Sequence, residues 1–125
     1  LTPFSHICPN CKATLSVGGP LWCGPLFDKT FCEKMKSEAE KRQFGTKRRV
    51  IRLLNRIIEE AEGPPLYYDI HSLCDKLSLP APKMERIMEY LREHGFKTTR
   101  THFCSTALRT TADVKKLKDA LRSLV

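Results

Sequence analysis

Eleven residues near the N-terminus, Gly18 to Asp28, restrict the fold of this chain more than any other stretch. They contain Gly-Pro-Leu twice, five residues apart, on either side of the only tryptophan, Trp22. Because proline fixes φ and glycine permits positive φ, this backbone is expected to take a defined, non-helical shape. Its large apolar side chains predict that it lies against a core rather than in water. Asp28 is suited to cap a helix that follows.

The length and charge of the chain indicate one modest globular domain with a polyanionic partner. Its 125 residues begin at Leu1 rather than Met, so we expect a piece of a longer protein. The 22 Lys and Arg residues against 14 Asp and Glu residues give a net charge of +8, which favours nucleic acid. An inert basic surface is the alternative. No apolar run approaches the roughly 20 residues that span a bilayer, so no membrane partner is expected.

Two of the six cysteines form a motif, Cys8-Pro9-Asn10-Cys11. At this spacing both thiolates can bind one tetrahedral Zn²⁺, which predicts half of a zinc ribbon whose second Cys pair lies elsewhere. Two unligated cysteines and a redox motif are the alternatives, although the glycines and prolines downstream leave no room for the helix that a redox site needs. Cys32 and Cys74 fall on apolar helix faces. This usage indicates a reducing, intracellular location: the cytoplasm, or the nucleus or mitochondrion in a eukaryote.

Apolar periodicity predicts a mostly helical body. Helices are expected over 28–44, from the cap at Thr46 to Gly63, over 70–77 after the cap at Asp69, over 83–94, and after Thr111 or Asp113. The second helix carries a basic cluster in its first half, where positive charge opposes the helix dipole. The cluster comprises Lys47, Arg48, Arg49, Arg52 and Arg56. A polyanion explains this placement, and a solvated basic face is the alternative.

Three short strands complete the predicted pattern, over 66–68, 96–103 and 108–110. The predicted order of elements is that of a winged helix-turn-helix domain: helix, strand, helix, turn, helix and hairpin. This order predicts an α+β fold. In it, 83–94 takes the recognition position and the hairpin is the wing. Four residues of the hairpin are expected to contact RNA: Lys97, Arg100, His102 and Arg109. A structural role is the alternative for His102. The predicted units are 1–27 and 28–125.

These motifs resemble the C-terminal domain of the tRNA guanine-26 N2-dimethyltransferases. The resemblance rests on the Cys-x-x-Cys pair, on Gly18 to Asp28, on Tyr67 to His71 and on Gly95 to Phe103. It covers nearly the whole chain in order. The sequence departs from the family's Arg-Thr-Asp-Ala pattern at Thr111, where the carboxylate is replaced by a hydroxyl.

The resemblance implies a parent enzyme that uses S-adenosylmethionine to methylate the exocyclic amine of a guanine in the tRNA core. It places the cofactor and the catalysis in an N-terminal Rossmann-like domain. This sequence has no Gly-rich loop after a strand, and Gly63-Pro64-Pro65-Leu66 lacks the polar residue of a methyltransferase acceptor loop. We therefore expect the tRNA-binding part of the enzyme, with that domain and tRNA as partners. A free-standing winged-helix regulator that binds DNA is the alternative.

Overall fold

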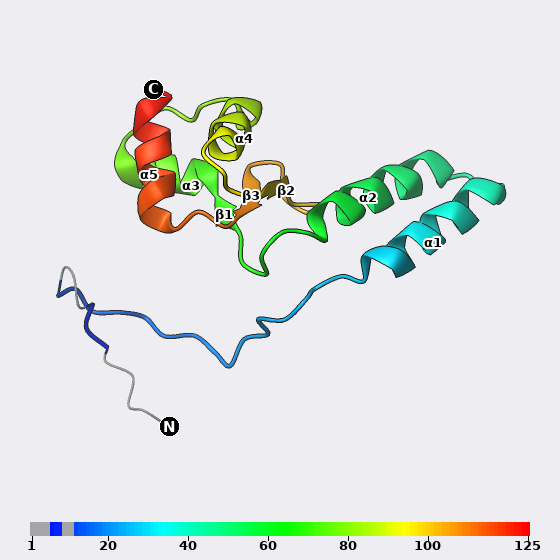
Figure 1. The fold of residues 1–125 in the computed structure, drawn as a ribbon, viewed down its shortest axis with the longest axis horizontal. Helices are drawn as coiled ribbons and strands as arrows, with labels where there is room; N and C mark the ends of the chain where they lie inside the picture. The colour runs from blue at the N-terminus through cyan, green and yellow to red at the C-terminus, as the bar shows by residue number, and fades with distance from the viewer. Residues whose placement is uncertain (1–5, 9–11) are drawn as a thin grey trace.

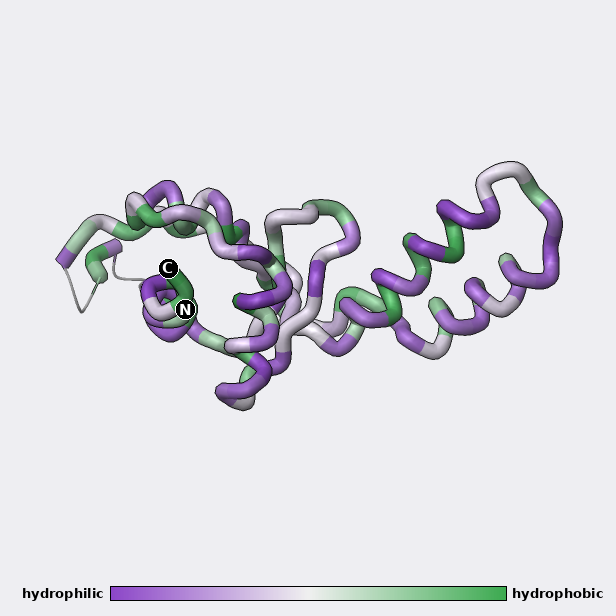
Figure 2. Tube along the Cα trace, turned by 90° about the horizontal axis from the view of Figure 1, so that it is seen from above, coloured by the Kyte–Doolittle hydropathy of each residue, from purple (hydrophilic) through white to green (hydrophobic). Residues whose placement is uncertain are grey.

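A helical hairpin projects from a small mixed lobe (Figure 1). The structure, a computed structural model, describes residues 6–8 and 12–125. Its elements are α1 (Lys29–Lys41), α2 (Lys47–Glu60), β1 (Tyr68–Asp69), α3 (Ile70–Leu77), α4 (Met84–Glu93), β2 (Thr98–Arg100), β3 (Ala107–Thr110) and α5 (Val114–Ser123). We call α1 and α2 the arm, and residues 66–125 the lobe. Seen from above, the arm extends from one side of the lobe (Figure 2).

The hydrophobic core lies in the lobe. Three helices, the central strand and the connection between β3 and α5 contribute its buried side chains: Ile70, Cys74, Met84, Ile87, Met88, Leu91, Leu108, Ala112, Leu117, Ala120 and Leu121. The sheet is antiparallel throughout in the order β1-β3-β2, with Tyr68 opposite Leu108 and Thr99 opposite Arg109. This arrangement confirms a mostly helical fold with a small sheet.

Aspartate caps begin three of the helices, as the sequence predicts. The carboxylate of Asp28 accepts from Phe31 N–H, that of Asp69 from His71 and Ser72 N–H, and that of Asp113 from Lys116 N–H. Each cap satisfies backbone donors that a helix start otherwise leaves without a partner. Thr46 occupies the N-cap position of α2, as predicted, and its carbonyl accepts from Val50 N–H at 3.0 Å, but its side chain makes no capping hydrogen bond.

The segment around Trp22 does not lie against a core, which corrects the first prediction. Leu21 and Trp22 are 70% and 71% exposed. The indole Nε1 donates to Pro25 O at 3.0 Å, and a Cβ at Gly24 would come within 2.7 Å of the Trp22 ring. The Gly-Pro-Leu repeat therefore folds the tryptophan onto its own backbone. Phe27 reaches the lobe instead, edge-on to His102 at 5.8 Å.

The first strand of the hairpin, β2, is shorter than the predicted 96–103, because the residues from Thr101 onward leave the ladder. Thr101 Oγ1 donates to Cys104 O at 2.7 Å and accepts from Cys104 N–H at 3.2 Å, which closes a turn. Cys32 and Cys74 are buried, as their helix positions predict. Within the described part of the chain, no helix has the length and apolar character needed to cross a membrane.

Candidate nucleic-acid interface

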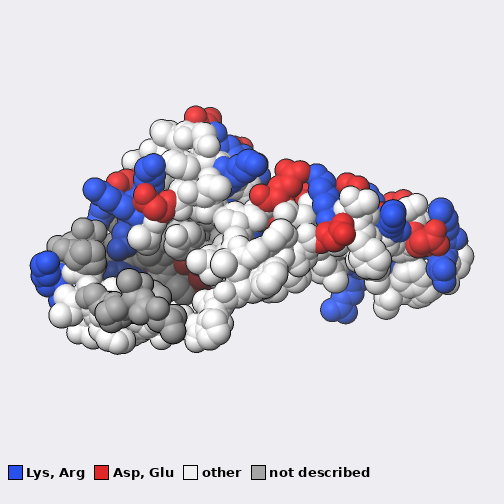
Figure 3. All heavy atoms as spheres, turned by 60° about the horizontal axis from the view of Figure 1, so that its bottom comes forward, with Lys and Arg blue, Asp and Glu red and all other residues white. Residues whose placement is uncertain are grey.

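The free end of the arm carries the most one-sided charge in the chain. Residues 41–56 contain seven Lys and Arg residues and no Asp or Glu. They form the end of α1, the turn and most of α2, and Figure 3 shows Lys and Arg side chains gathered at this free end. We call residues 41–56 the arm tip. It contains all five basic residues predicted on the second helix.

Four arginines of the arm tip have no acidic partner. On α1, Lys41 and Arg42 pair with Glu38 at 2.8 and 3.7 Å. Lys47 Nζ donates to Glu40 O at 2.6 Å and so joins the two helices. The remaining side chains are exposed and make no ion pair with any described residue: Arg48, Arg49, Arg52 and Arg56. Positive charge at the start of α2 opposes the helix dipole, so this position suits an anion better than it suits the fold.

A shallow hollow lies between the turn and the start of α2. Its volume is about 770 Å³. Its lining consists of Gln43, Phe44, Gly45, Thr46, Lys47, Arg48, Arg49 and Arg52. Four basic side chains around an open hollow can hold phosphate groups through charge-assisted hydrogen bonds. The tip is therefore suited to a polyanion rather than to a small apolar ligand.

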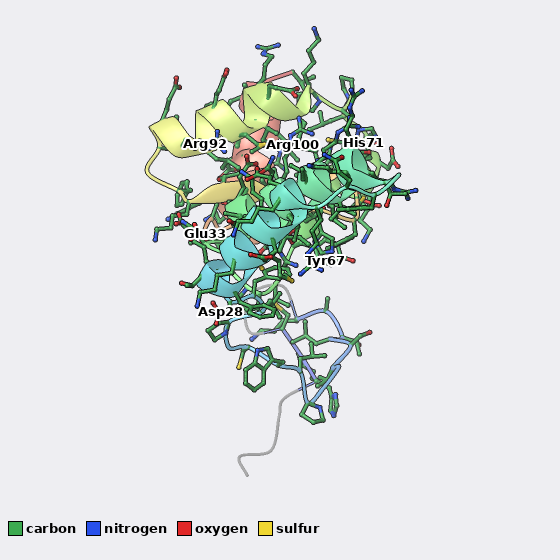
Figure 4. All side chains as sticks on the ribbon, turned by 90° about the vertical axis from the view of Figure 1, so that its right-hand side faces the viewer. Asp28, Glu33, Tyr67, His71, Arg92 and Arg100 are labelled. Atoms are coloured by element: carbon green, nitrogen blue, oxygen red, sulfur yellow. The ribbon has the colours of Figure 1, made fainter. Side chains whose placement is uncertain are left out.

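The hairpin does not present the basic surface that the sequence predicts. Arg109 is 4% exposed, so its predicted projection from the hairpin is wrong. Arg100 pairs with Glu85 on α4, and His102 is partly buried against Glu60. Lys97 is exposed and makes no salt bridge with any residue among 6–8 and 12–125, although the hydrogen bond from Lys29 and then the charge of Lys97 lower the pKa of Glu62. Viewed from the arm's free end, Arg92 and Arg100 lie on the α4 side of the arm, and Tyr67 lies on the opposite side (Figure 4).

Arg109 and His102 instead meet Glu60, the last residue of α2, in a buried network. Glu60 Oε1 accepts from Arg109 Nε at 2.5 Å. Glu60 Oε2 lies 2.8 Å from both the backbone N and the Nδ1 of His102. Arg109 Nη1 also donates to the carbonyls of Pro64 and Pro65. Glu60 is 1% exposed, so this is a desolvated charge cluster between the arm and the sheet.

Two half-exposed aromatic rings cover the guanidinium of Arg109. The centroids of Tyr67 and Phe103 lie 5.9 and 6.0 Å from Arg109 Cζ. The two rings meet edge-on at 5.0 Å. No sequence pattern predicts this cluster, because Glu60 and Arg109 are 49 positions apart and each is unremarkable in its own segment.

Helix α5 adds basic residues that the sequence interpretation left out. Lys116 lies over the Phe96 ring at 5.0 Å, and Arg122 pairs with Asp119 at 3.3 Å. Lys115 and Lys118 make no ion pair with any residue that the structure describes. The sequence does indicate this basic surface, because the last amphipathic helix contains four basic residues.

The predicted zinc site cannot be completed from the described residues. Cys11 lies outside them. Cys8 N–H donates to Ala13 O at 2.9 Å, and Lys12 N–H donates to Cys8 O at 3.0 Å. Among residues 6–8 and 12–125, no three His, Cys, Asp or Glu side chains gather in a way that would hold a metal ion. Zinc binding therefore stays a prediction from the Cys-x-x-Cys spacing.

The described residues do not fit S-adenosylmethionine. The sheet is antiparallel, whereas nucleoside cofactors of this kind bind at the carboxyl ends of parallel strands beside a Gly-rich turn. A cleft of about 610 Å³ lies between the base of the arm, α4 and β2. Ion pairs occupy it, Lys29 with Glu62 and Arg100 with Glu85, where an adenine ring needs an apolar slot.

Comparison with known proteins identifies relatives over the whole described fold. The sequence model of the N2,N2-dimethylguanosine tRNA methyltransferases matches residues 1–122. The tRNA (guanine(26)-N(2))-dimethyltransferases of Methanothermobacter thermautotrophicus and Methanocorpusculum labreanum are 37% and 38% identical over 123 and 122 residues. Each alignment covers 98% of this chain and 32% of the relative. The chain thus spans about a third of the length of these relatives.

A solved structure has the same fold. Trm1 from Pyrococcus horikoshii, in complex with S-adenosyl-L-methionine, superposes with a TM-score of 0.76 at 34% sequence identity. The match covers 88% of this chain and 30% of that chain. The similarity therefore extends to the three-dimensional arrangement, over about a third of a larger protein.

Proposed function

This chain belongs to the N2,N2-dimethylguanosine tRNA methyltransferase family, and we propose that it is the tRNA-binding C-terminal part of an enzyme that dimethylates guanine 26 of tRNA. The observation that carries the proposal is the arm tip. There, seven basic residues without an acidic one stand on a hairpin that projects from the lobe. The family supplies the substrate class, and the arm tip supplies the means of holding it.

A basic arm suits the way in which folded RNA is bound. The deep, narrow major groove of an A-form helix is closed to side chains, so proteins hold it mainly through its shape, its phosphates and its 2′-hydroxyls. Arginines on a projecting hairpin can follow a phosphate backbone without reading bases. Binding of this kind releases counterions and is therefore steeply dependent on salt.

The lobe supports the winged-helix part of the proposal in its strand order. The order β1-β3-β2, with α3 and α4 between β1 and β2, agrees with that architecture. The preceding helix α2 departs from it, since α2 pairs with α1 in the arm. Helix α4 presents Glu85, Glu89 and Glu93 to solvent, which is unfavourable in a DNA major groove. The alternative of a DNA-binding regulator is not favoured.

Methyl transfer belongs, in this proposal, to the remainder of a longer polypeptide. S-adenosylmethionine would supply the methyl group in that remainder, and this chain contributes affinity and orientation for tRNA. Zinc bound by Cys8 and Cys11 with ligands from elsewhere in the polypeptide is part of the same proposal. A cellular location where tRNA is processed follows from the substrate.

Removing charge from the arm tip tests the proposal. We expect Arg48→Ala/Arg52→Ala to weaken binding of unmodified tRNA, because both guanidinium groups contact phosphates. The slope of log K against log salt should fall by about two units or less, roughly one per lost phosphate contact. Filter binding at several salt concentrations measures both quantities.

The matched control removes two positive charges from positions outside the arm tip. Lys34 on α1 and Lys76 on α3 are exposed and make no ion pair with any described residue. Lys34→Ala/Lys76→Ala should leave the affinity and the salt slope near those of the unmodified chain. Equal losses in the two double variants would indicate a diffuse charge effect and would contradict a binding site at the arm tip.

A further inference from the structure

The arm is tied to the lobe through one carboxylate. Glu60 ends α2, and its side chain has no exposed surface. Among the described residues, the hydrogen bonds that join the arm to the lobe all end on Glu60. They come from Arg109 Nε, from His102 N and from His102 Nδ1. No other residue of the arm has a polar contact of this kind with the sheet.

A carboxylate is the only side chain that satisfies this site. Its two oxygens face three donors, one from Arg109 on β3 and two from His102, which lies in the turn between β2 and β3. His102 Nδ1 must carry a proton, because an unprotonated nitrogen at 2.8 Å would repel the carboxylate. A carboxamide of the same shape offers one oxygen and would direct its NH₂ group at one of these donors.

Arg109 extends the same contact to the segment between the arm and the lobe. Its Nη1 donates to the carbonyls of Pro64 and Pro65, while its Nε donates to Glu60. Gly63 allows the backbone between the arm and the lobe to lie close to Arg109, since a Cβ there would lie 3.1 Å from Arg109 Cβ. One planar guanidinium thus holds both the end of α2 and the backbone that follows it.

The direction of the arm needs such a contact, because no apolar side chain of the arm belongs to the core cluster of the lobe. The arm buries only Cys32 and Leu54 as apolar side chains, and neither belongs to the core cluster of the lobe. Apolar packing is non-directional, whereas a buried carboxylate with three donors accepts only a narrow range of orientations. The network therefore sets an angle rather than merely adding contact area.

We propose that Glu60 is a positioning residue, which fixes the arm relative to the lobe so that the arm tip and the lobe contact one tRNA together, the lobe through Lys115 and Lys118 of α5, which make no ion pair with any described residue. This inference rests on the proposed function. Two surfaces held at a fixed spacing bind a rigid polyanion with a high effective concentration, and a freely swinging arm loses that advantage. Breaking the network should therefore uncouple the arm tip from binding.

Residual dipolar couplings test the fixed angle without RNA. In the weakly aligned, ¹⁵N-labelled chain, couplings from the arm and from the lobe should fit one alignment tensor. In the Glu60→Gln variant, the couplings from the arm should fit only a separate alignment tensor of smaller magnitude, because the arm then moves relative to the lobe. Glu59→Gln is the matched control, because Glu59 is the neighbouring exposed carboxylate and has no ion pair within the described chain. If Glu60→Gln does not fold, Arg109→Lys keeps the charge but loses the planar fork and should give the same result.

The role of Glu60 in tRNA binding is tested by introducing the arm-tip substitutions into the Glu60→Gln and Glu59→Gln variants. Arg48→Ala/Arg52→Ala should lower the tRNA affinity by a smaller factor in the Glu60→Gln variant than in the Glu59→Gln variant. A merely stabilising Glu60 would lower the melting temperature and leave that factor unchanged, which would overturn the inference. One shared tensor in Glu60→Gln would also overturn it.

The two readouts separate this inference from the proposed function. If the arm gains its own tensor but the tip substitutions weaken tRNA binding in neither background, then tRNA binding by the tip is refuted. The role of Glu60 in that binding is refuted with it. If the tip substitutions act equally in both backgrounds, tRNA binding stands and the positioning role is overturned.

Discussion

Gly63 shows how much a single residue position contributes to the contact between arm and lobe. A Cβ built there would lie 2.7 Å from Thr99 Oγ1 and 3.2 Å from Arg109 Cδ. Thr99 Oγ1 is itself a buried oxygen, so an added methyl group would have to fit into the packed interior between Gly63, Thr99 and Arg109. The glycine is required here by close packing rather than by its backbone freedom.

We expect Gly63→Ala to destabilise the fold by about 1–3 kcal/mol, the usual cost of forcing an extra methyl group into a packed site. The free energy of unfolding in urea measures this change. Gly45→Ala is the control, because a Cβ at Gly45 meets no atom within 4 Å and should change stability by less than about 0.5 kcal/mol. Equal effects at the two glycines would contradict the packing explanation.

Among the secondary-structure elements, α3 shows how a local cap places the start of a helix. Asp69 Oδ1 accepts from the N–H groups of His71 and Ser72, and its Oδ2 accepts from Ser72 Oγ. Burial alone would raise the pKa of Asp69, but these bonds and one from Thr106 outweigh it and lower the pKa below 3.8. The charged carboxylate therefore favours the folded state.

The lowered pKa makes the contribution of this cap dependent on pH. It is fully present above pH 3.8, the ordinary value for aspartate, and is lost as the pH falls through the lower pKa of the folded state. At neutral pH, Asp69→Asn should be less stable by about 0.3–1 kcal/mol, because the neutral amide still caps but carries no charge toward the helix dipole. Urea unfolding across this range should show the difference shrinking in acid. A constant difference would contradict the charged cap.

The whole molecule combines a well-packed lobe with a thin arm. Eleven buried residues form the core of the lobe, whereas the arm buries two apolar side chains. Regions with few buried contacts open locally at lower free energy than the core. The arm can thus keep a fixed direction at its base through Glu60 while its helices open and close locally.

Native-state hydrogen exchange should reveal this difference. Amides of α4 and β3 are expected to exchange most slowly, and those of α1 and the arm tip several times faster or more. Addition of tRNA should slow exchange at the arm tip if the proposed site is correct. Uniform protection of α1 and α4 would show instead that arm and lobe unfold as one cooperative unit.

The local features of this protein can be predicted from its amino-acid sequence. The order of helices and strands, the caps at Asp28, Asp69 and Asp113 and the buried faces at Cys32 and Cys74 all follow from neighbours a few positions apart. The family also follows from short motifs in order. These features are predictable because the forces behind them act within one turn of helix or one strand. The basic cluster of the arm tip is visible in the sequence for the same reason.

Which charges face solvent and which are buried depends on contacts between segments that are distant in the sequence. Arg109 looks like any exposed strand arginine until Glu60, 49 residues away, is placed beside it. Trp22 looks like a core residue until its segment is seen to fold onto itself. In both cases the outcome depends on desolvation and on partners from distant segments. Only the folded chain brings those partners together, and no local pattern encodes them.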